Sequence, residues 1–121
     1  MIGGGTAGLE AACTAAEVGC NTFLLEEKET LGGLAAEISK IPAKKRLADF
    51  PHYLEHRAAA LDNLYIFTGT QATPENIRKF HPNLIVNATG SGPLLPPIKG
   101  LMDNIDKEGG NVYSILGMIN H

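Results

Sequence analysis

The sequence predicts an α/β fold built on a doubly wound parallel sheet, and three observations lead to this prediction. Short apolar segments typical of buried strands alternate along the chain with segments typical of helices. Half of the 14 glycines lie in the first 33 of the 121 residues, which indicates backbone that turns sharply or approaches another group closely. Crossover connections between parallel strands are right-handed, which leaves a Rossmann-like arrangement as the main candidate.

The N-terminal part is predicted to contain a strand, a turn, a helix and a second strand. Residues 1–2 are typical of the end of a strand, and residues 3–8 of a glycine-rich turn. Residues 7–18 are rich in Ala and predict a helix, which Gly19 ends as a C-terminal cap. Residues 22–25 are predicted to be a short buried strand.

The middle of the chain is predicted to contain a helix and a third strand. Residues 30–33 are predicted to form a turn, and residues 40–46 form a basic, irregular stretch around a proline. Asp49 is expected to be the N-cap of a helix that runs to about residue 61. Residues 64–68 are predicted to be a strand.

The C-terminal part is predicted to be less regular. Thr73 is expected to cap a short helix that runs to about residue 80, and residues 84–88 predict another apolar strand. Beyond Gly90, prolines exclude regular structure, at Pro93, Pro96 and Pro97. Residues 112–118 are expected to form a final short strand or turn.

The composition excludes several classes of function. A net charge of −3 provides no basic surface for nucleic acid or for an anionic membrane, and no apolar run approaches the roughly 20 residues of a membrane span. No secretory signal is evident, so a cytoplasmic protein with reduced Cys13 and Cys20 is expected. Two histidines, His52 and His56, have helical spacing but lack a third ligand. No metal site and no catalytic nucleophile are predicted.

Three glycines follow the first strand with the spacing of a dinucleotide-binding turn. Gly3 allows a tight turn, Gly5 lets the backbone approach a pyrophosphate, and Gly8 lets the helix lie close to the strand. The free N–H groups and the positive end of the helix would then face the anion. An acidic chain could thus bind a diphosphate through its main chain. The alternative is a glycine-rich turn without a ligand.

Glu26 provides a second indication of a dinucleotide site. It lies 18 residues after Gly8, at the end of the second strand, close to the position of an acid that binds ribose hydroxyls. A carboxylate there would accept hydrogen bonds from the 2′-OH and 3′-OH and would repel a 2′-phosphate. The alternative is that residues 26–29 form a solvated charged loop. The combined pattern predicts an adenine dinucleotide and does not decide between FAD and NAD.

Four segments resemble, in the same order, the FAD-binding domain of the pyridine-nucleotide-linked flavoprotein superfamily: IGGGTAGLEAA (2–12), LGGL (31–34), NLIVNATG (83–90) and PPIKG (96–100). They are most similar to the C-terminal part of NADH:flavin oxidoreductases such as 2,4-dienoyl-CoA reductase, enoate reductase and trimethylamine dehydrogenase. The Ala-Thr-Gly run is the more discriminating match. The resemblance implies a Rossmann-like fold of the FAD/NAD(P)-binding type over residues 1–90 and a crossing segment over residues 91–121.

The resemblance implies cofactor-binding positions, grouped here by the part of FAD that they approach. The glycine turn would surround the pyrophosphate, the two acids after the second strand would hold the adenosine ribose, and main chain near residue 72 would meet the adenine. Gly33 and Leu34 would lie along the pyrophosphate–ribitol side, and the Ala-Thr-Gly run would pass close to the cofactor. These positions are Gly3, Gly5, Thr6, Ala7, Gly8, Glu26, Glu27, Gly33, Leu34, Ala72, Ala88, Thr89 and Gly90.

The resemblance also implies a function. In the family, a second domain binds NAD(P)H and reduces FAD, and electrons pass on to an FMN and an iron–sulfur cluster. In trimethylamine dehydrogenase the equivalent site holds ADP. The expected function is therefore an FAD- or ADP-binding fragment, truncated at both ends, of a larger NAD(P)H-dependent flavoenzyme, inactive alone. The alternatives are a stand-alone module that binds ADP or NAD without redox activity, and a remnant that has lost binding.

Overall fold

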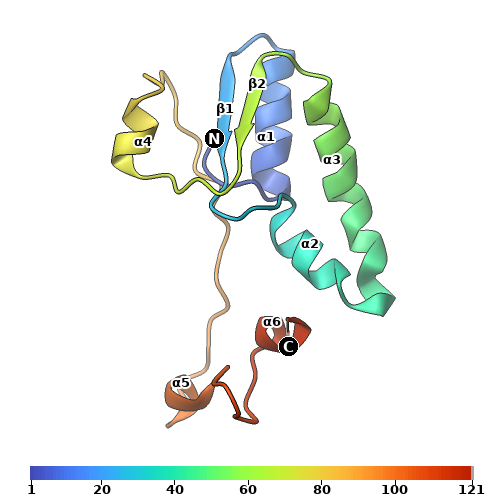
Figure 1. The fold of residues 1–121 in the computed structure, drawn as a ribbon, viewed down its shortest axis with the longest axis vertical. Helices are drawn as coiled ribbons and strands as arrows, with labels where there is room; N and C mark the ends of the chain where they lie inside the picture. The colour runs from blue at the N-terminus through green and yellow to red at the C-terminus, as the bar shows by residue number, and fades with distance from the viewer. Residues whose placement is uncertain (121) are drawn as a thin grey trace.

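The structure is a computed structural model that describes residues 1–120, and it contains parallel strands covered by helices. Strands β1 (Thr22–Leu25) and β2 (Leu64–Phe67) pair in parallel, with Thr22 opposite Leu64. Helix α1 (Thr6–Glu17) lies against this pair, and α3 (Asp49–Ala59) lies alongside α1 (Figure 1). The predicted α/β class and both predicted strands are confirmed.

Two single-residue bridges extend the strand pair. Ile2 forms parallel bridges to Leu25 on one side and to Asn87 on the other. The Ile2 N–H donates to the Val86 carbonyl at 2.9 Å, and the Ala88 N–H donates to the Ile2 carbonyl at 2.8 Å. The spatial order is therefore β2, β1, Ile2, Asn87, with all neighbours parallel.

The strand predicted at residues 84–88 is wrong in its extent. The structure has an isolated bridge at Asn87 there, and the side chains of Leu84 and Ile85 are 80% and 52% exposed. The physical reason is that the pairing partner provides only Met1 and Ile2 before the turn at Gly3. Too few ladder bonds form for a regular strand.

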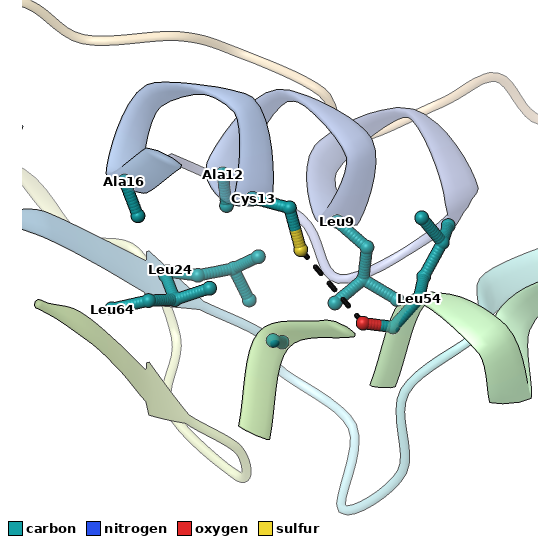
Figure 2. Close-up of a cluster of buried hydrophobic side chains, with 8 residues drawn as sticks. Leu9, Ala12, Cys13, Ala16, Leu24, Leu54 and Leu64 are labelled. Carbon is teal, nitrogen blue, oxygen red and sulfur yellow. Dashed lines mark hydrogen bonds between the residues drawn. The ribbon is translucent and has the colours of Figure 1, made fainter. Parts of the chain in front are cut away.

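The buried core joins α1, the strands and α3. Small residues of α1 let it approach the strands closely, so that Leu9 and Cys13 contact Leu54 of α3 and Leu24 of β1 (Figure 2). The Cys13 Sγ lies 3.8 Å from the Leu54 carbonyl oxygen, as expected for a weak hydrogen bond. Burial raises the pKa of the Cys13 thiol. The core residues are Leu9, Ala12, Cys13, Ala16, Leu24, Leu54, Ala58 and Leu64.

An arginine joins α1 to α3 at the rim of this core. Arg57 of α3, whose side chain is 19% exposed, donates to Glu17 at 2.7 Å and to Glu10 at 2.8 Å. The adjacent guanidinium, hydrogen-bonded to the carboxylate, lowers the pKa of Glu17. Gly19 then ends the region of α1 with φ +99°, as predicted.

Two helical segments between β1 and α3 were not predicted. The turn predicted at residues 30–33 leads into α2 (Gly33–Ser39), for which no element was predicted. The stretch expected to be irregular around Pro42 forms the 3₁₀ helix η1 (Pro42–Ala48). Asp49 is not an N-cap, because η1 continues directly into α3 and Ala48 already has helical backbone angles. Asp49 is instead the first residue of α3.

The remaining segments are short. Thr73 caps α4 (Pro74–Arg78) by accepting a hydrogen bond from the Asn76 N–H at 3.2 Å, as predicted. Residues 91–98 have no regular structure, as the prolines predict. Helices α5 (Leu101–Asn104) and α6 (Ile115–Ile119) follow. The final segment, expected as a strand or turn, therefore contains a helix. Within residues 1–120, no helix has the length and apolar character needed to cross a membrane.

Candidate functional site

A pocket of about 570 Å³ lies where β1 ends, bordered by the glycine turn, α2 and the bridge segment at Asn87. All but one of the residues that the sequence assigned to a cofactor site line it. These are Gly3, Gly5, Thr6, Ala7, Glu26, Glu27, Gly33, Leu34, Ala72, Ala88, Thr89 and Gly90. The structure therefore brings together positions from five separate stretches of the sequence.

Gly8, the exception, lies behind the pocket wall. A Cβ atom at Gly8 would overlap the Gly3 carbonyl oxygen, and a Cβ at Gly3 would overlap the Ala88 carbonyl oxygen. Gly3 also has φ +104°, a conformation that favours glycine. These glycines hold α1, the turn and the bridge segment in close contact, and this close packing shapes the pocket.

The first turn of α1 borders the pocket with backbone N–H donors. Gly5 is the N-cap without a side-chain hydrogen bond, and the first turn of α1 carries no acidic residue. Backbone N–H groups at the start of a helix have no partner within the helix, and here Thr6 and Ala7 line the pocket. A helix of 12 residues also places partial positive charge at this end. This wall can therefore bind an anion.

Glu26 lies against the glycine turn. One carboxylate oxygen, Oε2, accepts a hydrogen bond from the Gly4 N–H at 2.6 Å, and the other accepts from the Lys28 N–H at 2.8 Å. The main chain of Glu26 continues the strand pairing, since its N–H donates to the Phe67 carbonyl at 2.9 Å. A carboxylate has further lone pairs, so Glu26 can still accept hydrogen bonds from a ligand.

Charged side chains from the loop after β1 and from α2 border the pocket. Glu26, Glu27 and Glu37 supply negative charge, and Lys28 supplies positive charge. The Lys40 ammonium lies 2.7 Å from Glu37 Oε2 and lowers the pKa of that carboxyl. Because acidic groups predominate, an anion would be held mainly by backbone N–H groups and not by side-chain cations.

Seven lining residues were missed by the sequence reasoning. Most are chain neighbours of assigned positions, so extending each motif by a residue or two would have found them. Glu37 lies one helical turn after Leu34 and would have followed from predicting α2. Leu116 carries no sequence signal. The missed residues are Ile2, Leu25, Lys28, Glu37, Gln71, Ser91 and Leu116.

No group of three or more His, Cys, Asp or Glu side chains is placed to hold a metal ion within residues 1–120. His52 and His56 lie on the exposed side of α3.

Comparison with known proteins shows what the chain is similar to. Residues 1–56 match the family model described as FAD dependent oxidoreductase. Over 100 residues the chain is 37% identical to an NADH oxidase of Thermoanaerobacter brockii, and over 114 residues it is 31% identical to an N,N-dimethylglycine/sarcosine dehydrogenase of Chromohalobacter salexigens. The chain is related to the FAD-dependent oxidoreductases. The resemblance expected from the four sequence segments is thereby confirmed.

The matched regions cover most of this chain and a small part of each relative. They include 83% of the chain and 15% of the NADH oxidase, and 94% of the chain and 16% of the dehydrogenase. A solved structure of 2-naphthoyl-CoA reductase in complex with 2-naphthoyl-CoA superposes with a TM-score of 0.79 at 28% sequence identity. It matches 86% of this chain, which spans 16% of that protein.

The pocket is compatible with the diphosphate of FAD. A Cβ atom built on Gly5 would have one neighbour within 4 Å, the Gly33 Cα at 3.8 Å, so the absence of a side chain leaves space at this wall. The N–H groups of Thr6 and Ala7 and the positive end of α1 match the charge of a diphosphate. The carboxylate of Glu26 matches the hydroxyl groups of a ribose.

Proposed function

We propose that this chain forms the site for the adenosine-diphosphate half of FAD in an NAD(P)H-dependent flavin oxidoreductase. The observation that carries the proposal is the pocket itself. Residues assigned independently from the sequence, in segments far apart along the chain, line one cavity at the start of α1. Its volume of about 570 Å³ lies in the usual range for small-molecule and cofactor sites.

The order of the strand segments supports a Rossmann-like fold of the FAD/NAD(P)-binding type. The order β2, β1, Ile2, Asn87 corresponds to the order 3-2-1-4 of a doubly wound sheet, with all neighbours parallel. In such sheets ligands bind beyond the carboxyl ends of the strands. The pocket is bordered by Leu25 and Glu26, which lie at the carboxyl end of β1.

Each group of lining residues has a distinct role in this proposal. The N–H groups of Thr6 and Ala7 bind the diphosphate, and Gly5 lets it approach the backbone. Glu26, already oriented by the Gly4 and Lys28 N–H groups, accepts hydrogen bonds from the adenosine ribose. Glu27 lies beside Glu26 at the same ribose. The remaining assigned residues border the adenine, the ribitol side and the rest of the cofactor, namely Gly33, Leu34, Ala72, Ala88, Thr89 and Gly90.

FAD held in this pocket would supply redox chemistry of the hydride-transfer kind. The chain's own residues bind and orient the cofactor. The similarity to an NADH oxidase supports NADH as the donor. We place the nicotinamide site, and any FMN or iron–sulfur centre, in other parts of a larger flavoenzyme that residues 91–121 lead toward.

Calorimetric titration of the chain with ADP, FAD and NAD tests this function. Binding of ADP and FAD is expected, because both carry the adenosine diphosphate that the pocket is proposed to hold. Equal binding of ADP and NAD with no preference for FAD would favour a stand-alone module without redox activity. Absence of binding by all three would contradict the proposed function and favour a remnant without a site.

A further inference from the structure

The pocket is bordered on one side by a helix from the far end of the chain. Leu116 of α6 lines the pocket together with Leu34 and Glu37 of α2, and α6 packs against α2. In Figure 1 the segment after Gly90 runs away from the strands to α5 before the chain returns at α6. Among the described residues of α6, Leu116 is the one that lines the pocket.

Polar contacts hold α6 at this position. The Lys40 Nζ donates to Glu37 Oε2 and to Asn120 Oδ1, each at 2.7 Å. The Asn120 side chain also donates to the Leu116 carbonyl at 3.0 Å. Exposed pairs of this kind contribute little stability individually. They do fix which face of α6, and therefore which side chain, is turned toward α2.

A second set of contacts holds the short helix itself together. The Asp106 carboxylate accepts hydrogen bonds from the Ser114 N–H at 2.8 Å and from the Ser114 hydroxyl at 2.6 Å. The Ser114 hydroxyl oxygen in turn accepts from the Gly117 N–H at 2.9 Å. A five-residue helix is unstable in isolation, so this cap and the packing on α2 are what maintain α6.

The position of α6 relative to the rest of the pocket indicates which part of a ligand it meets. In Figure 1 the chain after β2, which contains Ala72, leaves toward α4 on one side of the strand ends, and α2 and α6 lie on the other side. In the proposed function Ala72 and Glu26 border the adenosine. The apolar side chains of Leu34 and Leu116 therefore lie away from the adenosine end.

We infer that α6 is part of the cofactor site and that Leu116 contacts FAD beyond its diphosphate, at the ribitol or the flavin ring. This inference rests on the proposed function, because it assumes that the pocket holds FAD with its adenosine near Glu26. The side chain acts as an apolar wall, and the Lys40–Asn120 hydrogen bond keeps that wall in place. The segment after Gly90 thereby helps to distinguish FAD from ADP.

Titration with ADP and with FAD in parallel tests this inference. Leu116→Ala is expected to weaken FAD binding roughly tenfold, the usual effect of removing an apolar contact from a pocket, and to leave ADP binding unchanged. Asn120→Ala, which removes the hydrogen bond from Lys40, is expected to act in the same direction. Ile115→Ala is the matched control, because Ile115 is in the same helix, is 72% exposed and does not line the pocket.

Thermal unfolding by circular dichroism verifies that each variant is folded. If the unmodified chain binds ADP, and Leu116→Ala and Asn120→Ala leave the ratio of FAD to ADP affinity unchanged, the inference is wrong and the proposed function stands. Equal weakening of ADP and FAD in both variants would also overturn it. If the unmodified chain binds neither nucleotide, the proposed function fails and the inference fails with it.

Discussion

At the scale of single residues, the pocket depends on one glycine, whose lack of a side chain leaves space for a ligand, and on one carboxylate. Gly5 lines the wall where a diphosphate would approach α1, and Glu26 lies at the end of β1 with both carboxylate oxygens bound to backbone N–H groups. Neither residue belongs to the buried core. Gly5→Val therefore separates ligand binding from folding. Substitution of Glu26 also removes its hydrogen bonds to the Gly4 and Lys28 N–H groups, so its test includes a melting curve.

Gly5→Val is expected to abolish binding of ADP and FAD and to leave the chain folded. The backbone at Gly5 has φ −73°, which any residue adopts, and a Cβ there makes only ordinary contact with Gly33. The added side chain occupies space beside the N–H groups of α1. Calorimetry measures the binding and circular dichroism the folding.

Gly92→Val is the control for this substitution, because Gly92 has open space around it and does not line the pocket. It should bind ADP as the unmodified chain does. Normal ADP affinity in Gly5→Val would show that the diphosphate does not approach this wall.

Glu26→Ala is expected to weaken ADP binding by about 1–3 kcal/mol, the range for hydrogen bonds between a charged group and a ligand. It should also reduce the preference for ADP over ADP that carries a 2′-phosphate, because the repelling carboxylate is removed. Titration with both nucleotides measures the two effects. Glu29→Ala changes the net charge equally, does not line the pocket and should leave both affinities unchanged. An unaltered preference in Glu26→Ala would argue against a ribose at this position.

At the scale of secondary-structure elements, the site depends on how α1 is placed relative to the strands and α3. The α1 N-terminus faces the pocket, and Arg57 of α3 joins α3 to two positions along α1, Glu10 in its first half and Glu17 at its end. This contact should make part of the stability depend on pH, since Arg57 lowers the pKa of Glu17.

Arg57→Met is expected to lower the melting temperature at pH 7 and to have a smaller effect at pH 2.5. A carboxyl whose pKa is lowered on folding stabilises the fold above its unfolded pKa of about 4.3, and this stabilisation is lost as the pH falls through the lowered value. Melting curves of both proteins across this range measure the difference. Lys79→Met, which removes the same charge outside these ion pairs, is the control. A difference between Arg57→Met and the unmodified chain that stays constant with pH would contradict this account.

The sequence allowed the elements with strong local signals to be predicted. α1 follows from an Ala-rich run that Gly19 ends, β1 and β2 follow from short apolar segments, and α4 follows from Thr73 and Pro74. By contrast, α2 and η1 depend on packing against each other and against neighbouring helices, which no short-range pattern encodes. The strand at residues 84–88 was overestimated because an apolar run carries no information about how much backbone is available to pair with it.

The residues of the site divide in the same way, into those that a local sequence signal identifies and those that only tertiary packing brings to the pocket. Residues with a special backbone or chemical role, such as Gly3 and Glu26, could be identified from their spacing. Leu116 could not, because an ordinary leucine enters the pocket only through the tertiary packing of α6 on α2.

At the scale of the whole molecule, widely separated segments of the chain form a single pocket at the carboxyl ends of parallel strands, and the central claim is that this pocket binds a nucleotide. The chain spans a small part of its relatives, so this claim concerns binding and not a complete catalytic cycle. The observation that supports this claim is that residues from the glycine turn, the end of β1, the start of α2 and the segment after Asn87 line the same pocket.

The most direct test is to map amide chemical shifts of the chain by nuclear magnetic resonance during titration with ADP. The largest changes are expected at the N–H groups of Gly5, Thr6 and Ala7, together with changes at Glu26 and Ala72. The glycine-rich loop around Gly109 and Gly110 should remain unaffected and serves as an internal reference. The largest changes at that loop, or saturating ADP without any change at the start of α1, would contradict the claim.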